Sequence, residues 1–109
     1  MCDARVISQK GATVVSRCAG CNCLFIWNHN LVLNFTMQQF SQFRNFIADL
    51  VPDDHTFPFP DGSQRLVMRT PVNDIQLTFT LDEWEDLNAA MEEASQMQAI
   101  FDLLEDSEM

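Results

Sequence analysis

An internal repeat constrains the fold of this chain more than any other feature. Two segments, residues 30–47 ("NLVLNFTMQQFSQFRNFI") and 74–91 ("DIQLTFTLDEWEDLNAAM"), align without a gap. Each copy begins with apolar residues at every second position, the pattern of a half-buried strand. Each continues with apolar residues at every third or fourth position, which predicts an amphipathic helix. The chain therefore repeats a strand followed directly by a helix.

The junction between strand and helix has the same chemistry in both copies. A threonine ends each strand, and a glutamine or glutamate follows three residues later, which is the pattern of a capping box. The two pairs are Thr36 with Gln39 and Thr80 with Glu83. We expect one helix to follow Thr36 and end before Pro52, because proline disfavours helix at the preceding residue. The second helix is expected over residues 81–104.

Further strands are predicted upstream of each repeat copy. Residues 23–28 and 65–70 are apolar runs, and the Asn- and Asp-containing segments after them suit hairpin turns. Residues 12–17 form an extra N-terminal strand. The prediction is a single α+β domain over residues 1–109. Two β-β-α repeats, at about 12–50 and 65–104, share one antiparallel sheet with the helices packed on one face.

Charge and composition exclude several classes of function. The net charge is −10, and only six residues are Lys or Arg. Residues 1–50 carry +2 and the remainder −12, so no basic patch is available for nucleic acid or for an anionic membrane. No apolar run approaches the roughly 18 residues of a membrane helix. The N-terminal residues lack the apolar core of a secretory leader, so we expect a cytoplasmic protein with reduced thiols.

The segment "CAGCNC", residues 18–23, is the strongest candidate for chemistry. Cys18 and Cys21 form a Cys-x-x-Cys pair between two predicted strands, as in a zinc knuckle. Asn22 suits the positive φ that such a turn often requires. Tetrahedral zinc needs four ligands. The remaining candidates are Cys23, Cys2, His29 and His55, or the same pair from a second copy of the chain.

Two other interpretations of the cysteines stay open. They can be small, partly buried side chains of a tight hairpin with no function beyond packing. They can also be a thiol redox site, although a thioredoxin-like pair lies at a helix N-terminus and this one leads into a strand. The first interpretation implies no cofactor. No catalytic motif is present, and neither His29 nor His55 has a nucleophile at a useful spacing, so we expect no enzymatic activity.

The second helix is longer than the first and keeps an apolar stripe to its end. The stripe continues through Met97, Ile100, Phe101 and Leu104. Such a stripe without cover inside the chain predicts a partner surface. Phe57 and Phe59, in a proline-bounded loop, are further candidates. The main hypothesis is a non-enzymatic protein-interaction module that forms a homodimer through the C-terminal helix or binds another protein.

The order of these features resembles a small bacterial family of unknown function. In that family a Cys-x-x-Cys knuckle precedes an N-L-x-L-x-F strand and a helix with F-x-x-F. The matching residues are Cys18, Cys21, Asn30, Leu31, Leu33, Phe35, Phe40 and Phe43. Asn22 stands where the family has glycine, and Cys23 is additional. The resemblance implies a small cytoplasmic bacterial protein and no known activity.

Overall fold

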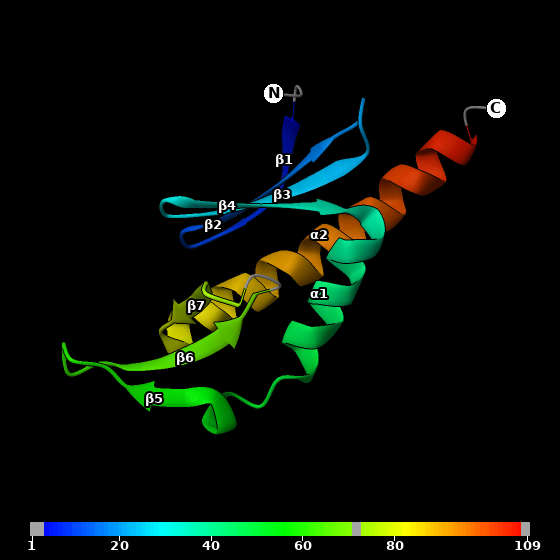
Figure 1. Ribbon diagram of the computed structural model, residues 1–109. Coiled ribbons are helices and arrows are strands. Elements are labelled where there is room, and N and C mark those ends of the chain that lie inside the picture. The colour runs from blue at the N-terminus through cyan, green and yellow to red at the C-terminus, as the bar shows by residue number, and fades with distance from the viewer. Residues whose placement is uncertain (1–3, 71–72, 108–109) are drawn as a thin grey trace.

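The chain forms two antiparallel sheets and two α-helices (Figure 1). The computed structural model describes residues 4–70 and 73–107. The first sheet has four strands in chain order: β1 (Ala4–Lys10), β2 (Thr13–Cys18), β3 (Cys23–Asn28) and β4 (Leu31–Thr36). It is followed by α1 (Met37–Asp49) and a short 3-10 helix, η1 (Pro52–His55). The second sheet contains β5 (Thr56–Pro58), β6 (Gln64–Arg69) and β7 (Gln76–Phe79), and α2 (Leu81–Ser107) ends the described chain.

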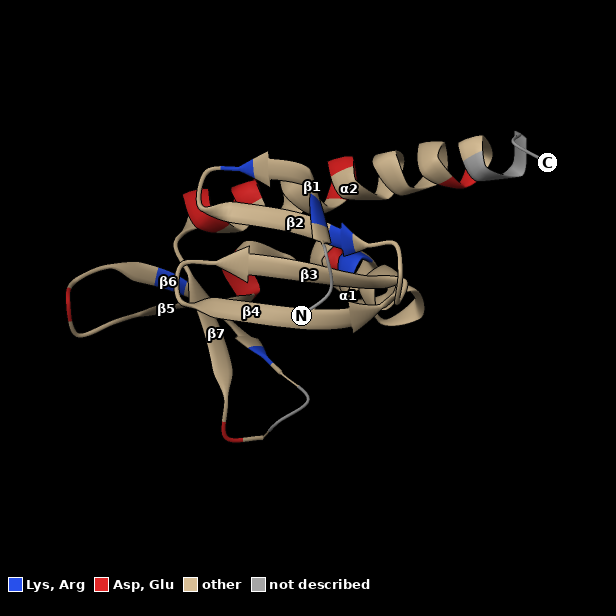
Figure 2. Ribbon diagram, turned by 90° about the horizontal axis from the view of Figure 1, so that it is seen from above, with Lys and Arg blue, Asp and Glu red and all other residues tan. Residues whose placement is uncertain are grey.

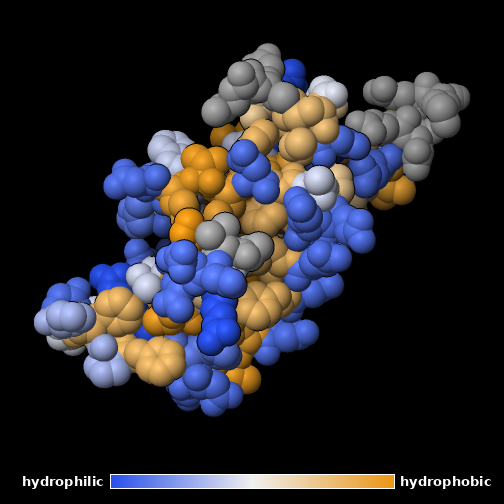
Figure 3. Space-filling model, viewed as in Figure 1, coloured by the Kyte–Doolittle hydropathy of each residue, from blue (hydrophilic) through white to orange (hydrophobic). Residues whose placement is uncertain are grey.

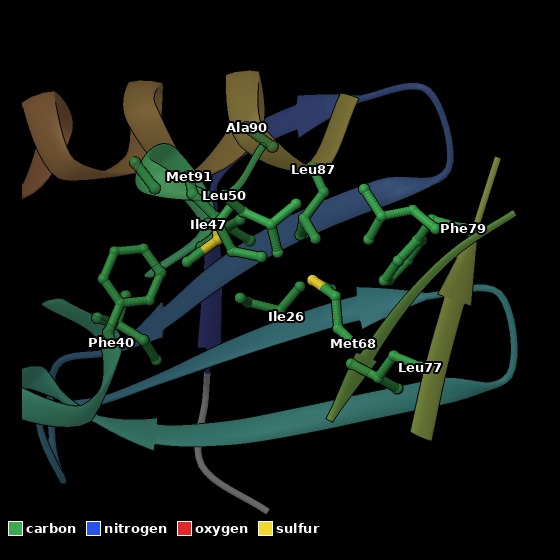
Figure 4. Packing of buried hydrophobic residues seen from close by; sticks show 14 of the residues in the cluster. Ile26, Phe40, Ile47, Leu50, Met68, Leu77, Phe79, Leu87, Ala90 and Met91 are labelled. Carbon is green, nitrogen blue, oxygen red and sulfur yellow. The ribbon is translucent and has the colours of Figure 1, made fainter. Parts of the chain in front are cut away.

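The core lies between the four-stranded sheet and a layer made of α1, α2 and the smaller sheet (Figures 1 and 4). One face of the four-stranded sheet, the inner face, supplies Val15, Leu24 and Ile26 to this core. The opposing layer contributes Ile47, Leu66, Met68, Leu87 and Met91. The α+β class and the packing of the helices on one face of this sheet are confirmed.

Both predicted capping boxes are present. The Thr36 hydroxyl accepts from the Gln39 N–H at 3.1 Å, and the Gln39 side chain accepts from the Thr36 N–H at 3.0 Å. The corresponding distances for Thr80 and Glu83 are 3.2 Å and 2.8 Å. These bonds satisfy N–H groups that a helix start leaves unpaired. They explain why each helix begins immediately after its strand.

Strand β1 was not predicted from the sequence. Its pairing with β2 is interrupted between Val6 and Ser8 by a bulge, so Ile7 and Ser8 are both buried. A bulge inserts one extra residue and breaks the alternation by which a strand is recognised. The extra N-terminal strand expected at residues 12–17 is present as β2, and β1 covers its other edge.

The two repeat halves lie in separate sheets, not in the single sheet that we expected. Strand β1 occupies the free edge of β2. Strand β5, within the proline-rich linker, occupies the free edge of β6. Pro58 is tolerated there because β5 is an edge strand. The remaining edges belong to β4 and β7, each of which leads directly into a helix, and the two sheets do not join.

A polar contact ties the turn of the first sheet to the helix of the second half. His29, at φ 53° in the β3–β4 turn, places Nε2 3.1 Å from Glu83 Oε2. Arg65 Nη1 lies 3.7 Å from Glu83 Oε1. The pKa of Glu83 is lowered, first by the hydrogen bond from the Thr80 N–H and then by the His29 side chain. Glu83 therefore joins the helix cap to both sheets.

Glu83→Gln is expected to flatten the acid dependence of stability. Glutamine keeps the capping acceptor, as Gln39 shows in the first half. A carboxylate with a lowered folded-state pKa stabilises the fold above its unfolded pKa, and this stabilisation is lost as pH falls through the folded value. Urea unfolding from about pH 5 to pH 3 should show a smaller loss for Glu83→Gln than for the wild type. Glu85→Gln, at an exposed position of the same helix, is the control and should lose stability with falling pH as the wild type does. The same pH dependence of stability in the wild type and both variants would contradict this role of Glu83.

Candidate functional site

The cysteine segment forms the turn between β2 and β3. Cys18 and Cys23 lie opposite each other in the register of the two strands. The Asn22 N–H donates to the Cys18 carbonyl at 2.8 Å, and Asn22 has the expected positive φ, 59°. Cys18 is buried, Cys23 is half-buried and Cys21 is exposed. The three thiols therefore share one end of a hairpin but differ in access to solvent.

The electrostatics at Cys23 do not favour a reactive thiolate. The pKa of Cys23 is raised, first by a hydrogen bond with the Cys21 side chain. The Cys23 thiol also donates to the Cys21 carbonyl at 3.5 Å. Desolvation and the neighbouring sulfurs of Cys21 and Cys18 act in the same direction. A raised pKa keeps the thiol protonated, whereas redox cysteines have lowered values. The motif also lies between two strands, so no helix N-terminus stabilises a thiolate.

The predicted zinc ligands are only partly brought together. Cys18, Cys21 and Cys23 share the turn, while Cys2 lies outside the described residues. His29 contacts Glu83 and His55 lies in η1. Across residues 4–70 and 73–107, no group of three or more His, Cys, Asp or Glu side chains is placed to hold a metal. Within the described residues, a single chain therefore supplies the three thiols of the turn but not the four ligands that a zinc ion needs.

The different exposures predict an order of thiol modification. In a Cys2→Ser background, a disulfide reagent should modify Cys21 rapidly, Cys23 more slowly and Cys18 only after unfolding, because the reagent must reach the sulfur. Mass spectrometry of timed samples measures this order. Cys21→Ser should remove the fast phase, and rapid labelling of Cys18 in the folded protein would be inconsistent with the structure.

The predicted partner-binding residues divide into covered and exposed positions. Met97 and Phe101 are partly buried and pack against the core. The Arg17 guanidinium lies 5.8 Å from the centre of the Phe101 ring. Arg17 of strand β2 thus covers part of the Phe101 ring, and this cover was not predicted from the sequence. Ile100 and Leu104 remain exposed, as does Leu103, which the sequence analysis did not select.

The two linker phenylalanines also differ. Phe57 lies on the edge strand β5 and is 52% exposed. Phe59 is half-buried, and its N–H donates to the Ser63 carbonyl at 2.9 Å within the β5–β6 turn. Phe57 is therefore available to a partner, whereas Phe59 takes part in forming the turn.

The outer face of the four-stranded sheet, opposite the helices, is a larger apolar surface that was not predicted from the sequence. The register places twelve residues of the strands on it. They form the rows Gln9–Val14–Trp27–Val32, Val6–Ser16–Phe25–Asn34 and Ala4–Cys18–Cys23–Thr36. No residue in these rows is charged, and β3 and β4 contain no charged residue at all (Figure 2). The charged residues Lys10 and Arg17 point inward, where they pair with Glu93 and Asp102 of α2.

Trp27 is the most prominent side chain of the outer face. It is 54% exposed, with Val14 and Val32 opposite it on the neighbouring strands. Its indole N–H donates to the His29 carbonyl at 2.6 Å, which fixes the orientation of the ring. The sequence signal for this surface is "CLFIWN", because a strand that is apolar at nearly every position has two apolar faces.

Comparison with known proteins identifies a family but no activity. A family of unknown function, DUF6686, has a model that matches residues 1–109. The chain belongs to this family. The suspected relationship to a domain of unknown function is thus confirmed. No curated protein and no solved structure matches the chain. Within the described residues, no helix of this DUF6686 chain is long and apolar enough to cross a membrane.

Proposed function

We propose that the protein is a non-enzymatic association module whose outer face binds a second copy of the chain. The observation that carries the proposal is an apolar sheet face without charge on a chain of net charge −10. Apolar residues on an exposed sheet face cost free energy unless another surface covers them. In a two-fold dimer the same patch meets itself, so an uncharged patch avoids placing like charges together.

Charge also distinguishes the outer face from the end of α2. Residues 99–108 contain four acidic residues and no Lys or Arg. A symmetric contact between two helix ends would bring like charges toward each other, which costs free energy within the screening length of about 8 Å at physiological salt. The outer face places no carboxylate in the contact. This comparison favours the sheet over the C-terminal helix that the sequence alone suggested.

The area of the outer face sets the expected strength of the dimer. Four strands spaced about 4.8 Å apart, with about six residues each, cover roughly 400 Å². Stable interfaces bury about 800 Å² on each partner. We therefore expect a reversible dimer that dissociates on dilution. The fixed ring of Trp27 favours binding, because little side-chain freedom is lost when it is covered.

Three matched substitutions test which surface associates. Trp27, Leu104 and Phe57 are 54%, 54% and 52% exposed, so a glutamate at each adds one charge without disturbing the core. Sedimentation velocity over a wide concentration range should show a dimer for the wild type, Leu104→Glu and Phe57→Glu, and a monomer for Trp27→Glu. If Leu104→Glu alone dissociates the dimer, the interface lies on α2 and not on the outer face. A wild type that stays monomeric at high concentration would reject self-association.

Zinc binding is the second candidate, supported by the three thiols at one end of the β2–β3 hairpin. We propose that a zinc ion bound there would take Cys18, Cys21 and Cys23 as available ligands. The set would be completed by Cys2 or by a second copy, because zinc prefers four thiolate or imidazole ligands. Cys18, Cys21 and Cys23 are thiols and not disulfides, which suits a reducing compartment such as the cytosol.

Elemental analysis tests zinc binding separately from self-association. If zinc is bound, protein purified without chelators should contain one ion per chain or one per dimer. The content should fall in Cys21→Ser, which alters an exposed side chain. Zinc-free wild-type protein would reject metal binding and leave the association proposal unaffected.

A further inference from the structure

A pocket of about 610 Å³ opens between β4, α1 and the β6–β7 hairpin. Figure 3 shows hydrophobic residues gathered at the centre of this side of the molecule, with hydrophilic residues around them. Small-molecule sites have volumes of roughly 300–1,000 Å³ and are mostly apolar with a few polar groups. The pocket lies within this range, and apart from Asn34 its lining residues are separate from the outer face.

One wall of the pocket is a stack of aromatic rings. Phe35 and Phe43 are 5.2 Å apart with an interplanar angle of 23°. Phe46 continues the stack, 6.4 Å from Phe43 at the same angle, and is 47% exposed. Leu33 and Leu77 add aliphatic surface. Aligned rings of this kind offer a flat apolar surface to a planar ligand.

Among the described residues that line the pocket, Arg69 is the only charged one. Lys10, Arg44 and Arg65 each form an ion pair with a carboxylate. Arg69 forms none with any residue in the described part of the chain. The chain has sixteen carboxylates, and Arg69 pairs with none of the described ones, which makes it a candidate anion-binding group beside an apolar pocket.

We propose that this pocket binds a small amphipathic carboxylate with a planar aromatic body. The ring system would lie against Phe43 and Phe46, and the carboxylate would pair with the Arg69 guanidinium, which can donate two parallel hydrogen bonds to it. A single arginine balances a single negative charge. The acidic remainder of the chain disfavours polyanions such as nucleotides. The ligand class therefore combines one carboxylate with an apolar ring system.

The proposal can be tested with naphthoate and its neutral analogue naphthylmethanol. In a titration followed by amide NMR, naphthoate should shift the signals of Phe35, Phe43 and Thr70 and leave those of Trp27 unchanged. Arg69→Gln should weaken naphthoate binding about tenfold, because a hydrogen-bonded charge pair is lost. Naphthylmethanol should bind wild type and Arg69→Gln equally. Phe46→Ala, at an exposed position, should weaken both compounds.

Arg5→Gln is the matched control. Arg5 is also exposed and forms no ion pair among the described residues, but it lies on β1, away from the pocket. It changes the net charge by the same amount and should leave naphthoate affinity unchanged. Equal affinity of wild type and Arg69→Gln for naphthoate, shifts centred on Trp27, or no binding would overturn the proposal. Because the readout is local, failure here does not bear on self-association.

Discussion

The burial of one side of α2 holds the two sheets together. Leu87, Ala90, Met91 and Ala94 form a stripe on this helix that is almost fully buried. The helix contacts β1 and β2 of the first sheet and β6 and β7 of the second. A three- or four-stranded sheet needs cover for its apolar face. Both sheets receive much of that cover from α2, so separate folding of the two halves would expose both inner faces.

Much of the fold was predictable because its signals are local. Five strands, β2, β3, β4, β6 and β7, follow from the apolar patterns, and both helix starts follow from the Thr-x-x-Gln/Glu pattern within a few residues. The bulge in β1 and the proline in β5 hide the two strands that close the sheet edges. When the strands β1 and β5 are not recognised in the sequence, a single sheet shared by the two repeat copies is the simplest arrangement. The error in sheet number therefore comes from the two edge strands β1 and β5.

The candidate sites were less predictable because they depend on how distant elements pack. The exposure of Ile100 and Leu104 could be read from the helix pattern, but the cover on Phe101 comes from Arg17 on a strand far away in sequence. The pocket joins β4 and α1 to Arg69 of β6. No spacing in the sequence relates these residues. The outer face had a local signal, the continuous apolar run of β3, whose meaning depends on which side the helices cover.

Strand β4 connects the two proposed surfaces. Val32 and Asn34 point to the outer face, whereas Leu33 and Phe35 point toward the pocket side, because successive side chains of a strand alternate. As an edge strand, β4 pairs with β3 on one side only. A small shift of β4 would therefore alter the spacing of Val32 from Trp27 and the position of Phe35 against Phe43. The proposed ligand site and the proposed association surface thus use opposite sides of one strand, so any coupling between them would pass through β4.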